Sequence, residues 1–117
     1  MKAVDEPNYG YLYDTFHFNI EEDSITSVIP ATIKQINHVH ISENNRGVPG
    51  AGHIDFQSVF NALKQAGYDG WMTIEAFGSA LPDLAAATKI WRPLFGSEAE
   101  VYEKGFKLMR EGWERAR

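Results

Sequence analysis

The 117-residue sequence contains no cysteine, which excludes both a disulfide framework and a thiolate metal site. It also lacks any block of Lys or Arg, and its formal net charge is −5. Because binding to a phosphate backbone depends on clustered cations, nucleic acid is not an expected partner. No apolar run approaches the roughly 20 residues that span a bilayer, and the N-terminus lacks the pattern of a signal peptide. We therefore expect a soluble, cytoplasmic protein without a membrane partner.

What is present is the composition of a globular domain, with 44% hydrophobic and 13% aromatic residues. Three short strand patterns alternate with amphipathic patterns along the chain, which favours parallel strands joined by right-handed crossovers. We predict strands near 11–14, 36–41 and 71–75, and helices near 27–35, 55–66, 83–91 and 98–116. The sequence shows no internal repeat and no linker, so residues 1–117 are expected to form a single α/β domain.

The stretch 36–52 (INHVHISENNRGVPGAG) organises the rest of the chain. In its first half, Val39 and Ile41 alternate with His38 and His40, as expected of a strand whose two faces differ. Its second half contains too many Gly and Pro residues for a helix or a strand, so it is expected to be a loop that carries Arg46. This pattern is typical of the end of an active-site strand. A buried histidine followed by an ordinary turn is the alternative.

Three ligand-type residues stand at the ends of the three predicted strands, namely Asp14, His40 and Glu75. In parallel α/β proteins, ligand sites lie at the carboxyl ends of the strands. Oxygen and nitrogen donors without thiolate suit Mn²⁺, Mg²⁺ or Co²⁺ as well as zinc. The pattern therefore predicts a divalent metal site. Three unrelated polar residues at strand ends are the alternative.

Other polar residues near these strand ends receive a structural interpretation. His38 lies one position deeper and is expected to be a satisfied histidine of a barrel interior, whereas His53 is expected at the surface. Glu43 is a candidate fourth ligand, although a solvated loop carboxylate is the favoured interpretation. His17 lies in the segment TFHFNIEEDS, which follows the first strand and is expected to be a loop.

The motifs DTFHFNIEE and HVHISENNRGVPGAG, with Glu75-x-Phe77, resemble ketose 3-epimerases of the D-tagatose and D-psicose (allulose) type. These belong to the xylose isomerase-like TIM-barrel superfamily of sugar isomerases and epimerases. The resemblance runs from about Pro7 to the final helix. A complete (β/α)₈ barrel takes roughly 250 residues. The resemblance thus implies the C-terminal portion of a TIM barrel, about three βα units that correspond to the sixth, seventh and eighth strands.

The resemblance also implies a role for each strand-end residue. Asp14 and His40 match metal ligands, and Glu75 matches a glutamate that both binds the metal and exchanges a proton with the substrate. His17 and Arg46 match residues that hold the sugar's oxygens near the metal. The implied metal is Mn²⁺, with Mg²⁺ or Co²⁺ as alternatives, and the implied substrate is a small-molecule ketose.

Two further points follow from the resemblance. Phe77 corresponds to an apolar wall of the substrate pocket. The family's fourth metal ligand, a second glutamate on an upstream strand, has no counterpart in this chain. Inverting a carbinol carbon beside a ketone requires a base on each face of that carbon. Glu75 can serve one face only, so this chain is expected to hold half of the proton-transfer machinery.

The predicted function is therefore metal-dependent C3 epimerisation of a ketose through an enediolate, in whole or as a fragment. Hydroxypyruvate isomerase-like aldose–ketose chemistry, an inactive metal- or sugar-binding module, and a structural fragment without an occupied site are the alternatives. Three parallel strands leave two unpaired edges, so we expect a homo-oligomer. Final helices that fold back over the open face of the sheet would be the alternative.

Overall fold

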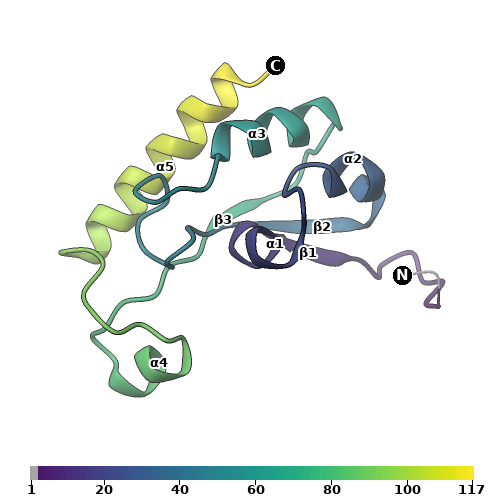
Figure 1. Cartoon of the computed structure of the whole chain (residues 1–117). Coiled ribbons are helices and arrows are strands. Elements are labelled where there is room, and N and C mark those ends of the chain that lie inside the picture. Colours follow the sequence, from purple (N-terminus) through teal and green to yellow (C-terminus); the bar gives the residue numbers. More distant parts are fainter. Residues whose placement is uncertain (1–2) are drawn as a thin grey trace.

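Three parallel strands form the sheet at the centre of the molecule in the computed structural model, which describes residues 3–117. The first two residues of the predicted domain lie outside the described residues. Strand β1 (Tyr11–Asp14) pairs with β2 (Ile36–Ile41), and β2 pairs with β3 (Met72–Ile74). Asp14 is in register with His40, and Ile41 is in register with Ile74. The carboxyl ends of the strands therefore meet at one edge of the sheet (Figure 1).

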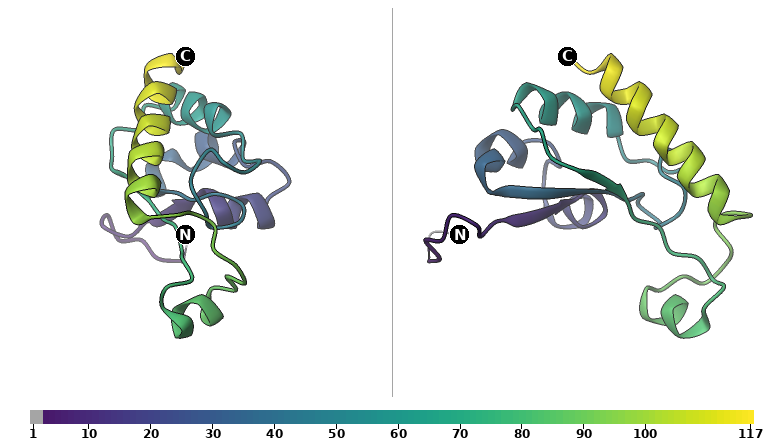
Figure 2. Two further views of the ribbon diagram at one scale, coloured as in Figure 1. Left: turned by 90° about the vertical axis from the view of Figure 1, so that its left-hand side faces the viewer. Right: turned by 180° about the vertical axis from the view of Figure 1, so that it is seen from behind.

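Helices connect and follow these strands. They are α1 (Thr15–Glu21), α2 (Val28–Thr32), the 3₁₀ turn η1 (Ile33–Gln35), α3 (Phe56–Gln65), α4 (Pro82–Ala87) and α5 (Glu98–Arg115). Figure 2 shows α2, α3 and α5 on the same side of the sheet, whereas α4 protrudes from the body of the molecule. No helix in residues 3–117 is long and apolar enough to cross a membrane.

The prediction that TFHFNIEEDS is a loop is wrong for its first seven residues, which form α1. The Asp14 carboxylate caps this helix, because its Oδ1 accepts hydrogen bonds from the backbone N–H groups of Phe16 at 2.8 Å and His17 at 3.2 Å. Phe18 then stacks on Tyr13 with ring centroids 4.6 Å apart. Tertiary packing thus stabilises a helix whose aromatic and polar residues are weak helix formers.

Two predicted helices are also shorter or less regular than the sequence pattern suggests. The helix expected over 83–91 ends at Ala87, and Lys89 adopts the left-handed conformation with φ of 62°. The Ile90 N–H donates to the Ala85 carbonyl at 2.8 Å, which closes the end of the helix. The helix expected over 27–35 is divided into α2 and η1. Glu75 lies just beyond β3, yet its N–H extends the sheet by donating to the Ile41 carbonyl at 3.0 Å.

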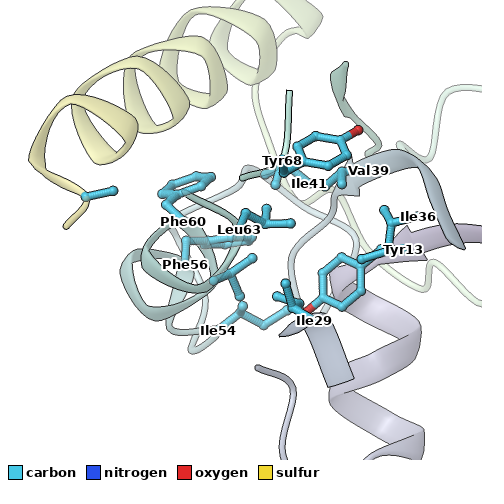
Figure 3. Close-up of a cluster of buried hydrophobic side chains, with 12 residues drawn as sticks. Tyr13, Ile29, Ile36, Val39, Ile41, Ile54, Phe56, Phe60, Leu63 and Tyr68 are labelled. Carbon is cyan, nitrogen blue, oxygen red and sulfur yellow. The ribbon is translucent and has the colours of Figure 1, made fainter. Parts of the chain in front are cut away.

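The hydrophobic core lies between the sheet and α3 (Figure 3). Its fully buried members include Tyr13, Val39 and Ile41 of the strands and Val59, Phe60 and Leu63 of α3. The Tyr13 hydroxyl donates to the Ile25 carbonyl at 2.5 Å, and burial raises the pKa of this hydroxyl well above its usual value. The residues that alternate with these on the strands face the opposite side of the sheet, where Leu12 remains 43% exposed.

Two glycines let α5 approach its neighbours closely. A Cβ atom at Gly105 would lie 2.6 Å from Ile74 Cδ1 of β3, and one at Gly112 would overlap the Phe60 ring of α3. The side-chain amide of Gln57 donates to the Gly112 carbonyl at 2.9 Å across the same contact. Helix α5 is therefore fixed on the covered side of the sheet.

We expect Gly112→Ala to lower the free energy of unfolding, because the added methyl group would overlap a fully buried ring at a cost of about 1–3 kcal/mol. This loss should exceed the gain of about 1 kcal/mol that alanine brings to a helix interior. Urea unfolding measures the difference. Glu103→Ala, at an exposed position of the same helix, is the control and should change stability by less than about 0.5 kcal/mol. Equal stability of the two variants would contradict the packing of α5 on α3.

Candidate functional site

The side chains of Asp14, His40 and Glu75 converge at the carboxyl edge of the sheet. His40 Nδ1 lies 3.5 Å from Asp14 Oδ2 and 3.5 Å from Glu75 Oε1. One ligand-type atom from each residue lies within 4.8 Å of the other two. The parallel register produces this arrangement, because it places Asp14 beside His40 and brings the end of β3 next to β2. The three residues could therefore hold one metal ion.

The donor atoms of this triad fit a divalent cation. His40 Nδ1 is buried and has no hydrogen-bond partner among residues 3–117, which is unusual because buried polar atoms are normally paired. The Oδ1 atom of Asp14 is occupied by the cap of α1, and Oδ2 is the oxygen that faces His40. One imidazole nitrogen and two carboxylate oxygens form a donor set that suits Mn²⁺, Mg²⁺, Co²⁺ or zinc.

Arg46 joins the triad from the glycine-rich loop that follows β2. Its Nη1 donates to Glu75 Oε2 at 2.6 Å and to Ser42 Oγ at 2.9 Å, and lies 3.7 Å from Asp14 Oδ2. Its Nη2 lies 3.1 Å from His17 Nε2. A guanidinium can only donate, so His17 Nε2 accepts and the imidazole proton resides on Nδ1. Arg46 thus holds one oxygen of Glu75 while the other faces His40.

Two aromatic rings fix the guanidinium of Arg46, which is only 9% exposed. Its central carbon lies 3.6 Å from the ring centroid of Phe16 and 5.2 Å from that of Phe77. The Phe77 N–H also donates to the Arg46 carbonyl at 2.8 Å. Arg46 has a φ of 66°, a conformation that costs roughly 1–3 kcal/mol outside glycine and persists only where the surroundings impose it. The arginine is therefore held in place by its protein neighbours.

The remaining sequence candidates lie around this centre. His38 Nε2 forms a hydrogen bond with Thr73 Oγ1 of the neighbouring strand at 3.0 Å, and its ring packs edge-to-face on His40. His53 is exposed. Neither residue belongs to the triad that could hold a metal.

The prediction that Glu43 is a solvated carboxylate is wrong, since this side chain is 0% exposed. Its oxygens accept three backbone N–H groups of the glycine-rich loop, so it is a structural element of that loop. The signal that could have revealed this was its position, directly before a glycine-rich segment whose backbone donors need acceptors.

Comparison with known proteins identifies the family. A family model described as "Xylose isomerase-like TIM barrel" matches residues 1–112. The ketose 3-epimerase of Arthrobacter globiformis is 40% identical over 86% of this chain and 36% of its own length. The L-ribulose 3-epimerase of Methylomonas sp. (strain DH-1) is 36% identical over 95% of this chain and 40% of its own length.

Solved structures agree with the sequence matches. D-allulose 3-epimerase from Methylomonas sp. in complex with D-allulose superposes with a TM-score of 0.87 and 35% identity over 94% of this chain and 39% of that protein. D-psicose 3-epimerase with D-tagatose from Clostridium cellulolyticum H10 superposes with a TM-score of 0.82 and 33% identity, and this chain again covers 39% of it. The resemblance seen in the motifs is thereby confirmed, over 36–40% of the length of these relatives. The chain belongs to the xylose isomerase-like TIM-barrel family, and its three-stranded α/β fold spans 36–40% of the length of the sugar 3-epimerases that it resembles.

Proposed function

We propose that this chain carries the metal-binding half of a ketose 3-epimerase centre, on the C-terminal βα units of the barrel. The observation that carries the proposal is the unpartnered, buried Nδ1 of His40 between the carboxylates of Asp14 and Glu75. Asp14, His40 and Glu75 would hold a divalent ion, with Mn²⁺ favoured and Mg²⁺ or Co²⁺ as alternatives. When bound, such an ion polarises the carbonyl of a ketose and makes the neighbouring C–H more acidic.

Glu75 is the residue that we assign to proton transfer. Arg46 and Ser42 fix its position, because Arg46 Nη1 bonds both the Glu75 carboxylate and the Ser42 hydroxyl. A fixed carboxylate can remove the C3 proton from one face of the ketose and return it to the same face. Inversion at C3 needs a second base on the opposite face. That base would come from outside this chain.

Arg46 and His17 are proposed to bind the sugar's oxygens, and Phe77 to form an apolar wall. The guanidinium has donors in a rigid planar arrangement, and the rings of Phe16 and Phe77 hold it beside the triad. A guanidinium fixed in this way loses little conformational freedom when it binds a sugar oxygen.

Hydrogen exchange in D₂O tests this function. With Mn²⁺ and D-psicose, NMR should show solvent deuterium entering at C3, and Glu75→Gln should abolish the exchange. His53→Ala, at an exposed position outside the triad, should leave the rate unchanged. Exchange at C1 in place of C3 would indicate aldose–ketose isomerisation. Binding of Mn²⁺ without exchange at either carbon would indicate a binding module without proton transfer.

We expect Arg46→Ala to slow C3 exchange by about 100-fold, because the donors that orient the sugar would be lost. The Kd for Mn²⁺ should change by less than about threefold, since the guanidinium is not a ligand. Exchange rates and titration calorimetry measure the two effects. Arg92→Ala, at an exposed arginine, is the matched control. A large loss of Mn²⁺ binding with an unchanged exchange rate would contradict the assigned role.

A further inference from the structure

Glu43 is fully buried, yet no ion pair within the described part of the chain includes it. Its Oε1 accepts hydrogen bonds from the N–H groups of Asn44 at 3.0 Å and Ile54 at 3.1 Å. Its Oε2 accepts one from the Gly50 N–H at 2.9 Å. Charge-assisted hydrogen bonds from the backbone thus compensate for the loss of water around this carboxylate. The loop is wrapped around the side chain.

The loop packs closely against Glu43 at Gly52. A Cβ atom at Gly52 would lie 2.6 Å from Glu43 Cδ and would overlap Asn44 Oδ1. The Asn44 Oδ1 atom in turn accepts a hydrogen bond from the His53 N–H at 2.9 Å. The backbone between Gly50 and Ile54 therefore lies directly against the Glu43 and Asn44 side chains, and a change at Glu43 must be transmitted to this backbone.

The same residue begins the turn that carries Arg46. The Arg46 N–H donates to the Glu43 carbonyl at 3.0 Å, and the Gly47 N–H donates to Asn45 Oδ1 at 3.0 Å. On the far side of the turn, the Phe77 N–H holds the Arg46 carbonyl. The left-handed backbone of Arg46 is thus imposed from two sides, by Glu43 and by Phe77.

We propose that Glu43 is a positioning residue, which acts through the glycine-rich loop to hold the Arg46 guanidinium against Glu75 and His17. The effect of Glu43 on sugar binding rests on the proposed function, in which Arg46 binds the sugar. The carboxylate oxygens are hydrogen-bonded by the loop, and Glu43 does not belong to the triad that could hold a metal.

Glu43→Gln tests this role with almost no change in volume. An amide offers one acceptor oxygen and one NH₂ donor, so at least one loop N–H would face a donor in place of an acceptor. Amide exchange at Gly50 or Ile54 should accelerate about tenfold. In ¹⁵N NMR spectra of the whole chain, the guanidinium protons of Arg46 should lose their protection by a similar factor.

Asp55→Asn is the matched control. The Asp55 carboxylate also accepts a backbone hydrogen bond, from the Ser58 N–H at 3.1 Å, but it caps α3 and has no contact with the Arg46 turn. Exchange at Arg46 should change by less than about twofold in this variant. If Glu43→Gln does not fold, Gly52→Ala tests the same coupling by displacing the Glu43 side chain.

An unchanged Arg46 in Glu43→Gln, or equal acceleration in both variants, would overturn the proposal. Calorimetry with Mn²⁺ supplies a second readout, because Glu43→Gln should keep the Kd within about threefold of wild type. Loss of Mn²⁺ binding with Arg46 still protected would make Glu43 a metal ligand and would also overturn it. Failure of the wild-type chain to bind Mn²⁺ would contradict the proposed function alone, since the exchange measurements need no metal.

Discussion

Asp14→Asn is expected to weaken Mn²⁺ binding by at least about tenfold. In the wild-type chain, Asp14 Oδ2 supplies one of the three donor atoms of the triad. The neutral amide oxygen of asparagine is a poorer ligand for a hard divalent cation than a carboxylate is. Titration calorimetry of wild type and variant measures the change. With only three protein ligands, the wild-type affinity should itself be lower than that of a complete epimerase site.

This substitution separates metal binding from folding. Asparagine is as good an N-cap as aspartate, so the hydrogen bonds to Phe16 and His17 that begin α1 should survive. The circular dichroism spectrum and the unfolding midpoint should therefore change little. His38→Asn is the control, because His38 lies next to the triad but outside it. If Asp14→Asn binds Mn²⁺ as tightly as wild type, the assignment of the site is wrong.

The triad could be anticipated from the sequence because its geometry follows from local rules. Strand periodicity places Asp14, His40 and Glu75 at strand ends, and parallel pairing aligns those ends. The environment of Glu43 could not be anticipated in this way. Its burial depends on N–H groups seven and eleven positions away in the chain. Hydrophobic periodicity does not predict the path of a glycine-rich loop between such positions.

Helix α1 and helix α5 show two other limits. The sequence of α1 has no clear apolar period, and its formation depends on a cap from Asp14 and on the packing of Phe18 against Tyr13. The final helix was expected from its apolar stripe, but the stripe is wider than the surface that covers it. Tyr102 and Phe106 are more than half exposed. Periodicity identifies the apolar face of a helix and does not tell what partner covers it.

The same limit applies to the sheet. On its uncovered face Leu12 is 43% exposed, and Trp71, directly before β3, is 80% exposed. Strands β1 and β3 are each paired on one side only within residues 3–117, and the relatives continue over more than half of their length beyond the matched region. Unpaired strand edges and a solvent-exposed apolar face favour association between chains. The alternative that the final helices cover this face does not hold in the structure, where α5 packs on α3 and β3 on the other side.

We therefore expect the isolated chain to form a dimer or a higher assembly at micromolar concentration, through the uncovered face and the free strand edges. Burying one large apolar side chain contributes about 1.5–3 kcal/mol, so two copies that cover Leu12 and Trp71 gain a large fraction of a domain's typical stability of about 5–15 kcal/mol. Sedimentation velocity measures the assembly, and Leu12→Lys should shift it towards the monomer.

Leu81→Lys is the control, because Leu81 is 64% exposed at the start of α4, which protrudes away from the sheet. It should leave the sedimentation coefficient unchanged. A wild-type chain that sediments as a compact monomer and melts cooperatively would contradict the expectation. Equal dissociation by both variants would contradict the assignment to the sheet face. If only Leu12→Lys dissociates the assembly, two copies of this chain associate through the uncovered face of the sheet. In a complete barrel, the other strands cover this same face.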